Sequence, residues 1–174
     1  RNTFETVQQQ NPDVASWYAE PPYAYLDPCP RYVGLNTMVA PFDYPEIRRA
    51  VNYAINRDQV VEIGWEGLTK TANWMLPDYA PLKAYMDANS DLLEQYGSGV
   101  YDLAKVDEIM TAKGYTKDGE GFWVKDGNRI AMNLIIRAGE TDQVKMAPVV
   151  AELLQRAGFD AQFTLQDIAA YGDA

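Results

Sequence analysis

The sequence predicts an α/β fold in which a mixed sheet is flanked by helices. Residues 130–137 and 160–166 are apolar, strand-like segments, and an amphipathic helical segment ending at Gly158 connects them. A strand–helix–strand unit of this kind has parallel strands and a right-handed crossover. The pair Asp126-Gly127 lies between two further apolar runs and is typical of an antiparallel hairpin. Apolar stripes elsewhere predict the helices that would cover such a sheet.

The N-terminal part of the chain predicts few regular elements. Residues 3–10 favour a short polar helix, and residues 14–18 alternate as a half-buried strand does. Residues 20–31 contain four prolines. Because proline fixes φ and lacks an N–H, this segment is predicted to be irregular or to lie at an edge. Residues 32–36 form a short apolar run, which we interpret as a buried strand ending at Asn36.

Two capped helices are predicted after this strand. Pro45 suits the first position of a helix, where its missing N–H would be unpaired in any case. Asn56 can end this helix and cap the next, with Gln59 as its capping-box partner. The second helix is expected at about residues 58–65 and stops at Gly67. The apolar stripe of the first helix, which should face the core, consists of Ile47, Ala50, Val51, Ala54 and Ile55.

Helices continue in the second half of the chain. Residues 81–96 have apolar positions at helical spacing with a break near the middle, and Asp102 can cap a helix that Gly114 ends in the left-handed conformation. Pro148 lies within the helix that ends at Gly158 and predicts either a kink or the true start of that helix. Asp167 is predicted to cap a last short helix.

Composition places the chain among soluble globular proteins. Its 174 residues can bury one substantial core, with 47% hydrophobic and 23% charged residues. A net charge of −10 argues against nucleic acid or an anionic membrane as partner. No apolar run approaches the length of a membrane span, and no signal peptide is found within the chain. Cys29 is the one cysteine, so no internal disulfide can form.

Residues for common catalytic and metal sites are missing from the sequence. The chain has no histidine, which excludes a histidine-based triad and imidazole metal ligands within it. A single cysteine excludes a cysteine-rich zinc site. Neither a P-loop nor a dinucleotide-binding glycine motif occurs. The sequence therefore predicts a binding protein, with no enzyme activity, no cofactor and no metal site.

The order of motifs between residues 32 and 77 resembles the family 5 extracellular solute-binding proteins. Members of this family are the periplasmic or lipid-anchored receptors of peptide, nickel and related ABC importers. The pattern of this family begins with a strand end, a Pro-Phe turn and a first helix. A capped junction to a second helix follows, then the glycine that ends that helix, and then a proline. The matching positions are Leu35-Asn36-Thr37, Pro41-Phe42, Arg49-Ala50, Ala54-Ile55-Asn56-Arg57, Gly67 and Pro77.

Motifs later in the chain resemble the same family, so the resemblance covers nearly the whole sequence. It implies that residues 1–174 form a single α/β domain without an internal boundary. This domain would be a truncated second lobe of a two-lobed, type II-like periplasmic binding protein. The later matches are Tyr101-Asp102, Ala112-Lys113-Gly114-Tyr115, Gly121-Phe122-Trp123, residues 130–137, Ala157-Gly158-Phe159-Asp160 and residues 167–171.

The resemblance also implies a function and a place in the cell. The receptor would capture a small solute, an oligopeptide or dipeptide by preference, between two lobes and deliver it to a membrane permease. It would be periplasmic, or lipid-anchored on the outer face of the cytoplasmic membrane. Its partners would be the solute, the permease subunits and the missing first lobe. Nickel chelates, opines and sugars remain open as ligands.

Candidate ligand-binding residues follow from the predicted sheet. Ligands of open α/β sheets bind outside the carboxyl ends of the strands. Two strand ends are predicted, at Asn36 and at Arg137, and Gly139 lies in the turn after the second. Several peptide-binding relatives carry an arginine at this strand end, so Arg137 is the first candidate for a ligand carboxylate, with an ion pair to Glu140 as the alternative. Trp74 is a candidate for an aromatic wall of the cleft, with core packing as its alternative.

A second class of function remains open at this point. Residues 21–32 combine prolines with tyrosines and could form the recognition surface of a protein–protein interaction domain with no small-molecule role.

Overall fold

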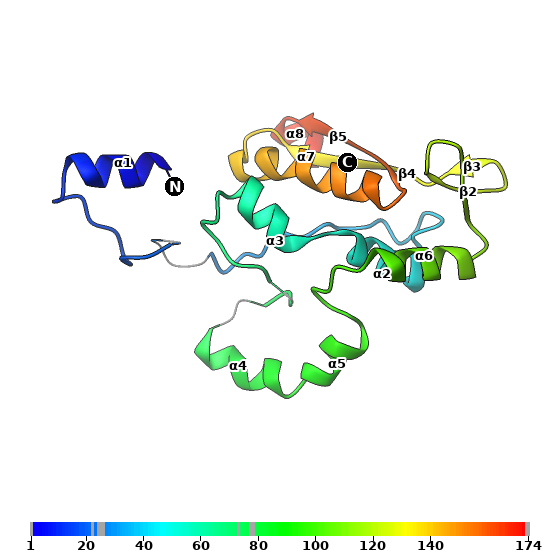
Figure 1. The fold of residues 1–174 in the computed structure, drawn as a ribbon, viewed down its shortest axis with the longest axis horizontal. Helices are drawn as coiled ribbons and strands as arrows, with labels where there is room; N and C mark the ends of the chain where they lie inside the picture. Colours follow the sequence, from blue (N-terminus) through cyan, green and yellow to red (C-terminus); the bar gives the residue numbers. More distant parts are fainter. Residues whose placement is uncertain (1, 22, 24–26, 73, 77–78, 173–174) are drawn as a thin grey trace.

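The computed structural model describes residues 2–21, 23, 27–72, 74–76 and 79–172 (Figure 1). Its centre is the parallel pair of strands β4 (Ala131–Arg137) and β5 (Asp160–Gln166), joined by helix α7 (Thr141–Arg156). Ala131 pairs with Asp160 at one end of the two strands, and Arg137 pairs with Gln166 at the other. The predicted strand–helix–strand unit with parallel strands is confirmed.

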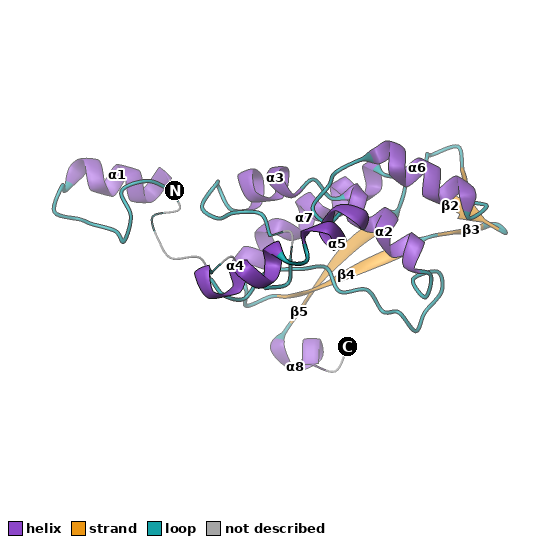
Figure 2. Cartoon of the chain, turned by 90° about the horizontal axis from the view of Figure 1, so that it is seen from below, coloured by secondary structure: helices purple, strands orange, loops and turns teal. Residues whose placement is uncertain are grey.

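Side chains alternate between the two faces along each strand, and one of these faces packs against α7. Met132 of β4 and its neighbour Ala161 of β5 are both buried on the face that packs against α7. A short last helix, α8 (Ile168–Gly172), contacts the same two strands and lies on their other side (Figure 2). The side chain of Asp167 accepts a hydrogen bond from the Ala170 N–H, as expected for its N-cap.

The end of α7 shows why Gly158 is required there. Its φ is 96°, a left-handed conformation that residues with a Cβ rarely adopt. The Phe159 N–H bonds the Leu154 carbonyl at 3.0 Å and the Gly158 N–H bonds the Gln155 carbonyl, which together form a Schellman motif. This motif turns the chain and places the Phe159 side chain in the core. Pro148 lies inside α7 and is not its start.

A layer of helices completes the core. The helices α2 (Pro45–Ala54) and α6 (Leu103–Ala112) pack against each other, and α2 also contacts α7. The predicted stripe of α2 is confirmed, since Ile47, Ala50, Val51 and Ala54 are all buried. After α2 come α3 (Arg57–Gln59) and a short π-helix, η1 (Val60–Gly64), which packs on α7.

The predicted cap at Asn56 is confirmed and supports a stability test. The Asn56 side chain accepts a hydrogen bond of 3.1 Å from the Gln59 N–H, which has no partner within the helix. We expect Asn56→Ala to lower the free energy of unfolding by about 1 kcal/mol. Urea unfolding measures this loss. The matched control is Asn56→Ser, whose hydroxyl can still cap and should recover most of the lost stability; equal losses in both variants would contradict the cap.

The hairpin predicted at Asp126-Gly127 is confirmed. Strands β2 (Trp123–Lys125) and β3 (Asn128–Arg129) are antiparallel, and φ is 52° at Asp126 and 78° at Gly127. Positive φ at both central residues is what a two-residue type I′ turn requires. A further strand, β1 (Thr116–Lys117), pairs with β2 and was not predicted. Among the described residues, the antiparallel and parallel strands form two separate sheets.

Among the described residues, five helices, including α3 and α8, have no buried residue. The others are α1 (Asn2–Gln10), α4 (Ala80–Asp87) and α5 (Ser90–Gln95). In Figure 1, α1 lies apart from the rest of the fold, and α4 and α5 lie below the layer that contains α2 and α6. Among the described residues, no helix is long and apolar enough to cross a membrane.

Two predicted strands are wrong. Residues 14–18 and 32–36 have no strand assignment, and no described strand pairs with either segment. Val33 and Leu35 still pack against the core, but Tyr32 is 74% exposed. An apolar run becomes a strand only when a neighbouring strand accepts and donates its backbone hydrogen bonds. Of the Tyr/Pro-rich segment 21–32, residues 22 and 24–26 lie outside the described part.

Candidate functional site

Two polar side chains lie next to each other at the carboxyl ends of the parallel strands β4 and β5, which we call the carboxyl edge of the sheet. Arg137 and Gln166 are register partners at the ends of β4 and β5. Because directly paired residues project to the same face of a sheet, both side chains lie on one face at this edge. The Ala138 N–H donates a hydrogen bond of 2.8 Å to the Gln166 carbonyl, which continues the pairing beyond the strands.

Gln166 was not among the predicted site residues, although the sequence contained the necessary signal. Both strand ends and their parallel pairing were predicted, so the residue beside Arg137 could have been identified. Its side-chain Oε1 is buried and has no hydrogen-bond partner among the described residues. A buried acceptor that lacks a donor lowers the stability of the folded protein. We therefore count this amide, together with Arg137, among the candidate ligand-binding groups.

The turn from β4 to α7 holds Arg137 against an acidic residue. The Arg137 Nη1 lies 3.2 Å from the Glu140 Oε1, and the two side chains are 37% and 35% exposed. The ion pair named above as the alternative for Arg137 is therefore present. Such exposed ion pairs contribute only about 0–1 kcal/mol to the free energy of unfolding. A guanidinium has five N–H donors, so Arg137 can bind a further carboxylate while it keeps or exchanges Glu140.

Gly139 lies in the same turn, where its backbone is open. A Cβ added at Gly139 would meet no heavy atom within 4 Å. The turn therefore leaves uncovered space at Gly139, two residues after Arg137.

A second arginine reaches the start of α7 from the N-terminal segment. The Arg31 Nε bonds the Asp142 Oδ2 at 2.7 Å, across 111 sequence positions. This hydrogen bond raises the pKa of the Arg31 guanidinium, and the charges of Asp142, Asp27 and Glu140 act in the same direction. Glu140 and Asp142 thus place two carboxylates at the α7 N-terminus, where negative charge is favoured, and each pairs with an arginine.

The other two predicted site residues lie on separate segments. The Asn36 Oδ1 accepts a hydrogen bond of 3.0 Å from the Met38 N–H, so it stabilises the turn before α2. Trp74 is half-buried and packs edge-on against Tyr85 of α4, with ring centroids 6.2 Å apart. Figure 1 shows α4 on the other side of the α2 layer from β4 and α7. The structure therefore brings together Arg137 and Gly139, but not Asn36 or Trp74.

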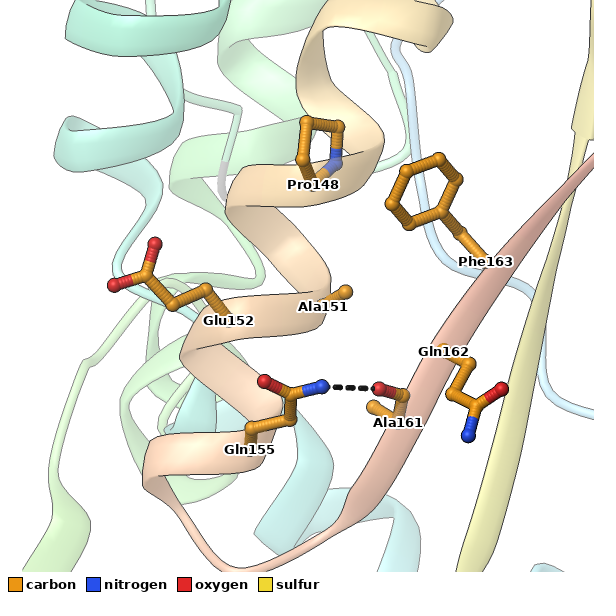
Figure 3. A pocket seen from close by; sticks show the side chains of 7 residues that line it. All are labelled: Pro148, Ala151, Glu152, Gln155, Ala161, Gln162 and Phe163. Carbon is orange, nitrogen blue, oxygen red and sulfur yellow. Dashed lines mark hydrogen bonds between the residues drawn. The ribbon is translucent and has the colours of Figure 1, made fainter.

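Two hollows occur elsewhere on the described surface. One, of about 360 Å³, is polar and is lined by Asn56, Arg57, Asp58, Thr71, Gly99 and Tyr101. Arg57 is held there by a 2.6 Å hydrogen bond to the Asn52 Oδ1, and partial burial lowers its pKa. The other hollow, of about 330 Å³, lies between α7 and β5 (Figure 3). Neither hollow includes Arg137. No cluster of three or more His, Cys, Asp or Glu residues suited to a metal occurs in the described ranges.

Comparisons with known proteins cover almost the whole chain. Residues 3–174 match the family described as bacterial extracellular solute-binding proteins, family 5 Middle. The glutathione-binding protein GsiB of Escherichia coli K12 is 28% identical over 137 residues, which are 79% of this chain and 23% of GsiB. The GsiB protein of Salmonella typhimurium is 35% identical over 85 residues, 49% of this chain and 15% of that protein.

Solved structures share the fold. A periplasmic oligopeptide-binding protein of Thermotoga maritima, solved with bound mannohexaose, matches 97% of this chain with a TM-score of 0.78 and 25% identity. NikA of Brucella suis, solved with Fe(III)-EDTA, matches 78% of the chain with a TM-score of 0.67 and 23% identity. This chain spans 31% and 26% of those two chains, so it corresponds to less than a third of each.

Proposed function

Because this chain belongs to the bacterial extracellular solute-binding proteins of family 5, we propose that it is the second-lobe part of an ABC importer receptor. In this proposal, residues 1–174 form one domain of a longer two-lobed protein. A small solute binds between the lobes, which close on it and then dock on permease subunits in the membrane. Ligand binding shifts the equilibrium between open and closed lobes toward the closed state. The size of the shift is set by the difference between the ligand's affinities for the two states.

The observation that carries the proposed site is the pairing of Arg137 with Gln166 at the carboxyl edge of the parallel sheet. An arginine and an amide side by side suit a ligand that carries a carboxylate and hydrogen-bonding groups. Peptides have both, and a glutathione-binding protein and an oligopeptide-binding protein are among the relatives. We therefore favour a short peptide with a free carboxylate, held by Arg137, with Gly139 leaving space two residues later in the turn. Asn36 and Trp74 would contribute only from the rim of the cleft.

Family membership also supports the proposed location and class of activity. The family is described as bacterial, extracellular and solute-binding, which names binding and not catalysis. We propose a periplasmic receptor, or one anchored by lipid to the outer face of the cytoplasmic membrane. The alternative function, a protein–protein interaction domain built on residues 21–32, is not favoured, since the family match includes that segment.

A sugar is the second candidate ligand, because the Thermotoga maritima relative was solved with mannohexaose. The two ligand classes make different demands on Arg137. A peptide carboxylate needs the guanidinium charge, whereas a neutral oligosaccharide binds by neutral hydrogen bonds and ring stacking.

Thermal shift of the longer receptor that contains this chain tests the proposal. We expect glutathione or a di- to hexapeptide to raise its melting temperature, since ligand at 100 times its Kd stabilises a protein by about 2.7 kcal/mol. Each peptide is matched with its C-terminal amide, which lacks the carboxylate and should stabilise less. Stabilisation by mannohexaose alone would assign a sugar ligand. If no peptide or sugar stabilises the receptor while residues 21–32 capture a protein, the interaction domain is correct.

The isolated chain should bind the same ligand much more weakly than the longer receptor does. Good sites bury about 70–90% of a small ligand, and one wall of a cleft leaves most of the ligand in water. Calorimetric titration of both proteins with one peptide measures the difference. Equal affinities would show that the site is complete within residues 1–174 and would contradict the two-lobed proposal.

A further inference from the structure

The turn between β4 and α7 carries more negative than positive charge. Residues 137–142 contain one basic side chain, Arg137, and two acidic ones, Glu140 and Asp142. The partial positive charge at the N-terminus of α7 offsets only about half of the excess elementary charge. A carboxylate that approaches Arg137 would therefore be repelled by this turn unless a further cation lies close by.

Arg31 supplies that cation from the N-terminal segment. Its Nε donates a hydrogen bond of 2.7 Å to the Asp142 Oδ2, and its Nη1 donates one of 3.1 Å to the Cys29 carbonyl. The Asp142 side chain is only 18% exposed, so water screens this ion pair less than it screens a fully exposed one. Asp27 is a weaker partner, with its Oδ2 3.7 Å from the Arg31 Nη2. Each nitrogen of the Arg31 guanidinium thus has a partner within the chain, so Arg31 is not itself a candidate ligand contact.

Glu140 interacts with both arginines. Its Oε1 lies 3.2 Å from the Arg137 Nη1, and Glu140 is the N-cap residue of α7, two positions before Asp142. The negative charge of Glu140 also raises the pKa of the Arg31 guanidinium, so the two groups attract each other through space. A ligand carboxylate at Arg137 would compete with Glu140 for the same guanidinium. The outcome of this competition depends on which other cation attracts Glu140.

We propose that Arg31 is a positioning residue of the carboxylate site at Arg137. It neutralises Asp142 and attracts Glu140, which leaves the Arg137 guanidinium available to the ligand. This inference rests on the proposed function, in which Arg137 binds a ligand carboxylate. When the ligand displaces Glu140, that carboxylate keeps the attraction of Arg31, so the exchange costs less than it would without this cation. Without Arg31, Asp142 and the displaced Glu140 would both repel the ligand.

A purely structural role for Arg31 makes a different prediction. The ion pair with Asp142 also ties residues 27–31 to α7. If that tie were the whole role, its loss would lower the stability of the fold and would weaken ligands with and without a carboxylate alike. A positioning role acts through the charge of Glu140, so its loss should weaken only ligands that carry a carboxylate.

Calorimetry of the proposed longer receptor with glutathione, trialanine and trialanine amide tests the proposal. We expect Arg31→Gln to weaken trialanine binding at least about threefold at low ionic strength, because the charges of neighbouring groups are coupled. Arg31→Lys keeps the charge and should recover most of that affinity, whereas trialanine amide should bind Arg31→Gln and the wild type alike. The matched control is Arg156→Gln, which removes an arginine charge at the C-terminal end of α7 and should leave trialanine binding unchanged.

A double-mutant cycle with Glu140 separates this inference from the proposed function. In a Glu140→Gln background, Arg31→Gln should reduce trialanine affinity much less than it does in the wild type, because the residue through which Arg31 acts has lost its charge. The same loss in both backgrounds, an equal loss for the amide, no loss at all, or failure of Arg31→Gln to fold overturns the role of Arg31. Arg137→Ala is the reference for the site itself. If it leaves trialanine affinity unchanged, or if neither trialanine nor glutathione binds, the carboxylate site is wrong and this inference is overturned with it.

Discussion

Replacing Phe159 by alanine is expected to lower the free energy of unfolding of this chain by about 3–5 kcal/mol. Phe159 is fully buried, with 0% of its surface exposed, in the core cluster shared by α2, α6, α7 and β5. Removing the ring forfeits its transfer free energy and leaves a cavity that the surrounding helices can only partly fill. The loss is a large fraction of the roughly 5–15 kcal/mol by which native domains are stable.

Urea unfolding measures this loss, and the chain offers a control of the same chemistry. Phe163→Ala removes an equal ring that is 41% exposed, so its cost should be clearly smaller. Equal losses at the two positions would mean that the core is not centred on Phe159.

Replacing Arg137 by alanine in the proposed longer receptor is expected to weaken binding of a carboxylate ligand by about 1.5–3 kcal/mol, which is roughly tenfold to a hundredfold or more. The guanidinium lies at the carboxyl edge of the sheet and is partly exposed. Its ion pair with Glu140 supports no buried side chain, so the melting temperature without ligand should hardly change. Calorimetry with a free peptide and with its C-terminal amide measures the effect.

Glu140→Gln is the matched variant for this test. It removes the negative charge that pairs with Arg137 and keeps the guanidinium. We expect it to preserve or increase the affinity for a carboxylate ligand, because the competing partner is weaker. Unchanged affinity in Arg137→Ala would exclude a ligand contact, and a large fall in its melting temperature would assign Arg137 to structure.

The amino-acid sequence by itself determined the local features of the fold. The cap at Asn56, the hairpin turn at Asp126-Gly127 and the end of α7 at Gly158 were all predicted and observed. Each depends on hydrogen bonds within a few residues and on a backbone conformation that few residue types adopt. The buried stripe of α2 was also predictable, because helical geometry alone decides which residues share a face.

Tertiary structure decided the features that need a distant partner. Residues 14–18 and 32–36 have strand-like patterns but no described strand beside them, so their patterns do not produce a sheet. The contact of Arg31 with Asp142 joins segments 111 positions apart, which no local pattern could indicate. The hollow between α7 and β5 likewise exists only because folding places the helix beside that strand. Strand pairing and ion pairs form between surfaces that folding brings together, so their partners are set by the packed structure and not by neighbouring residues.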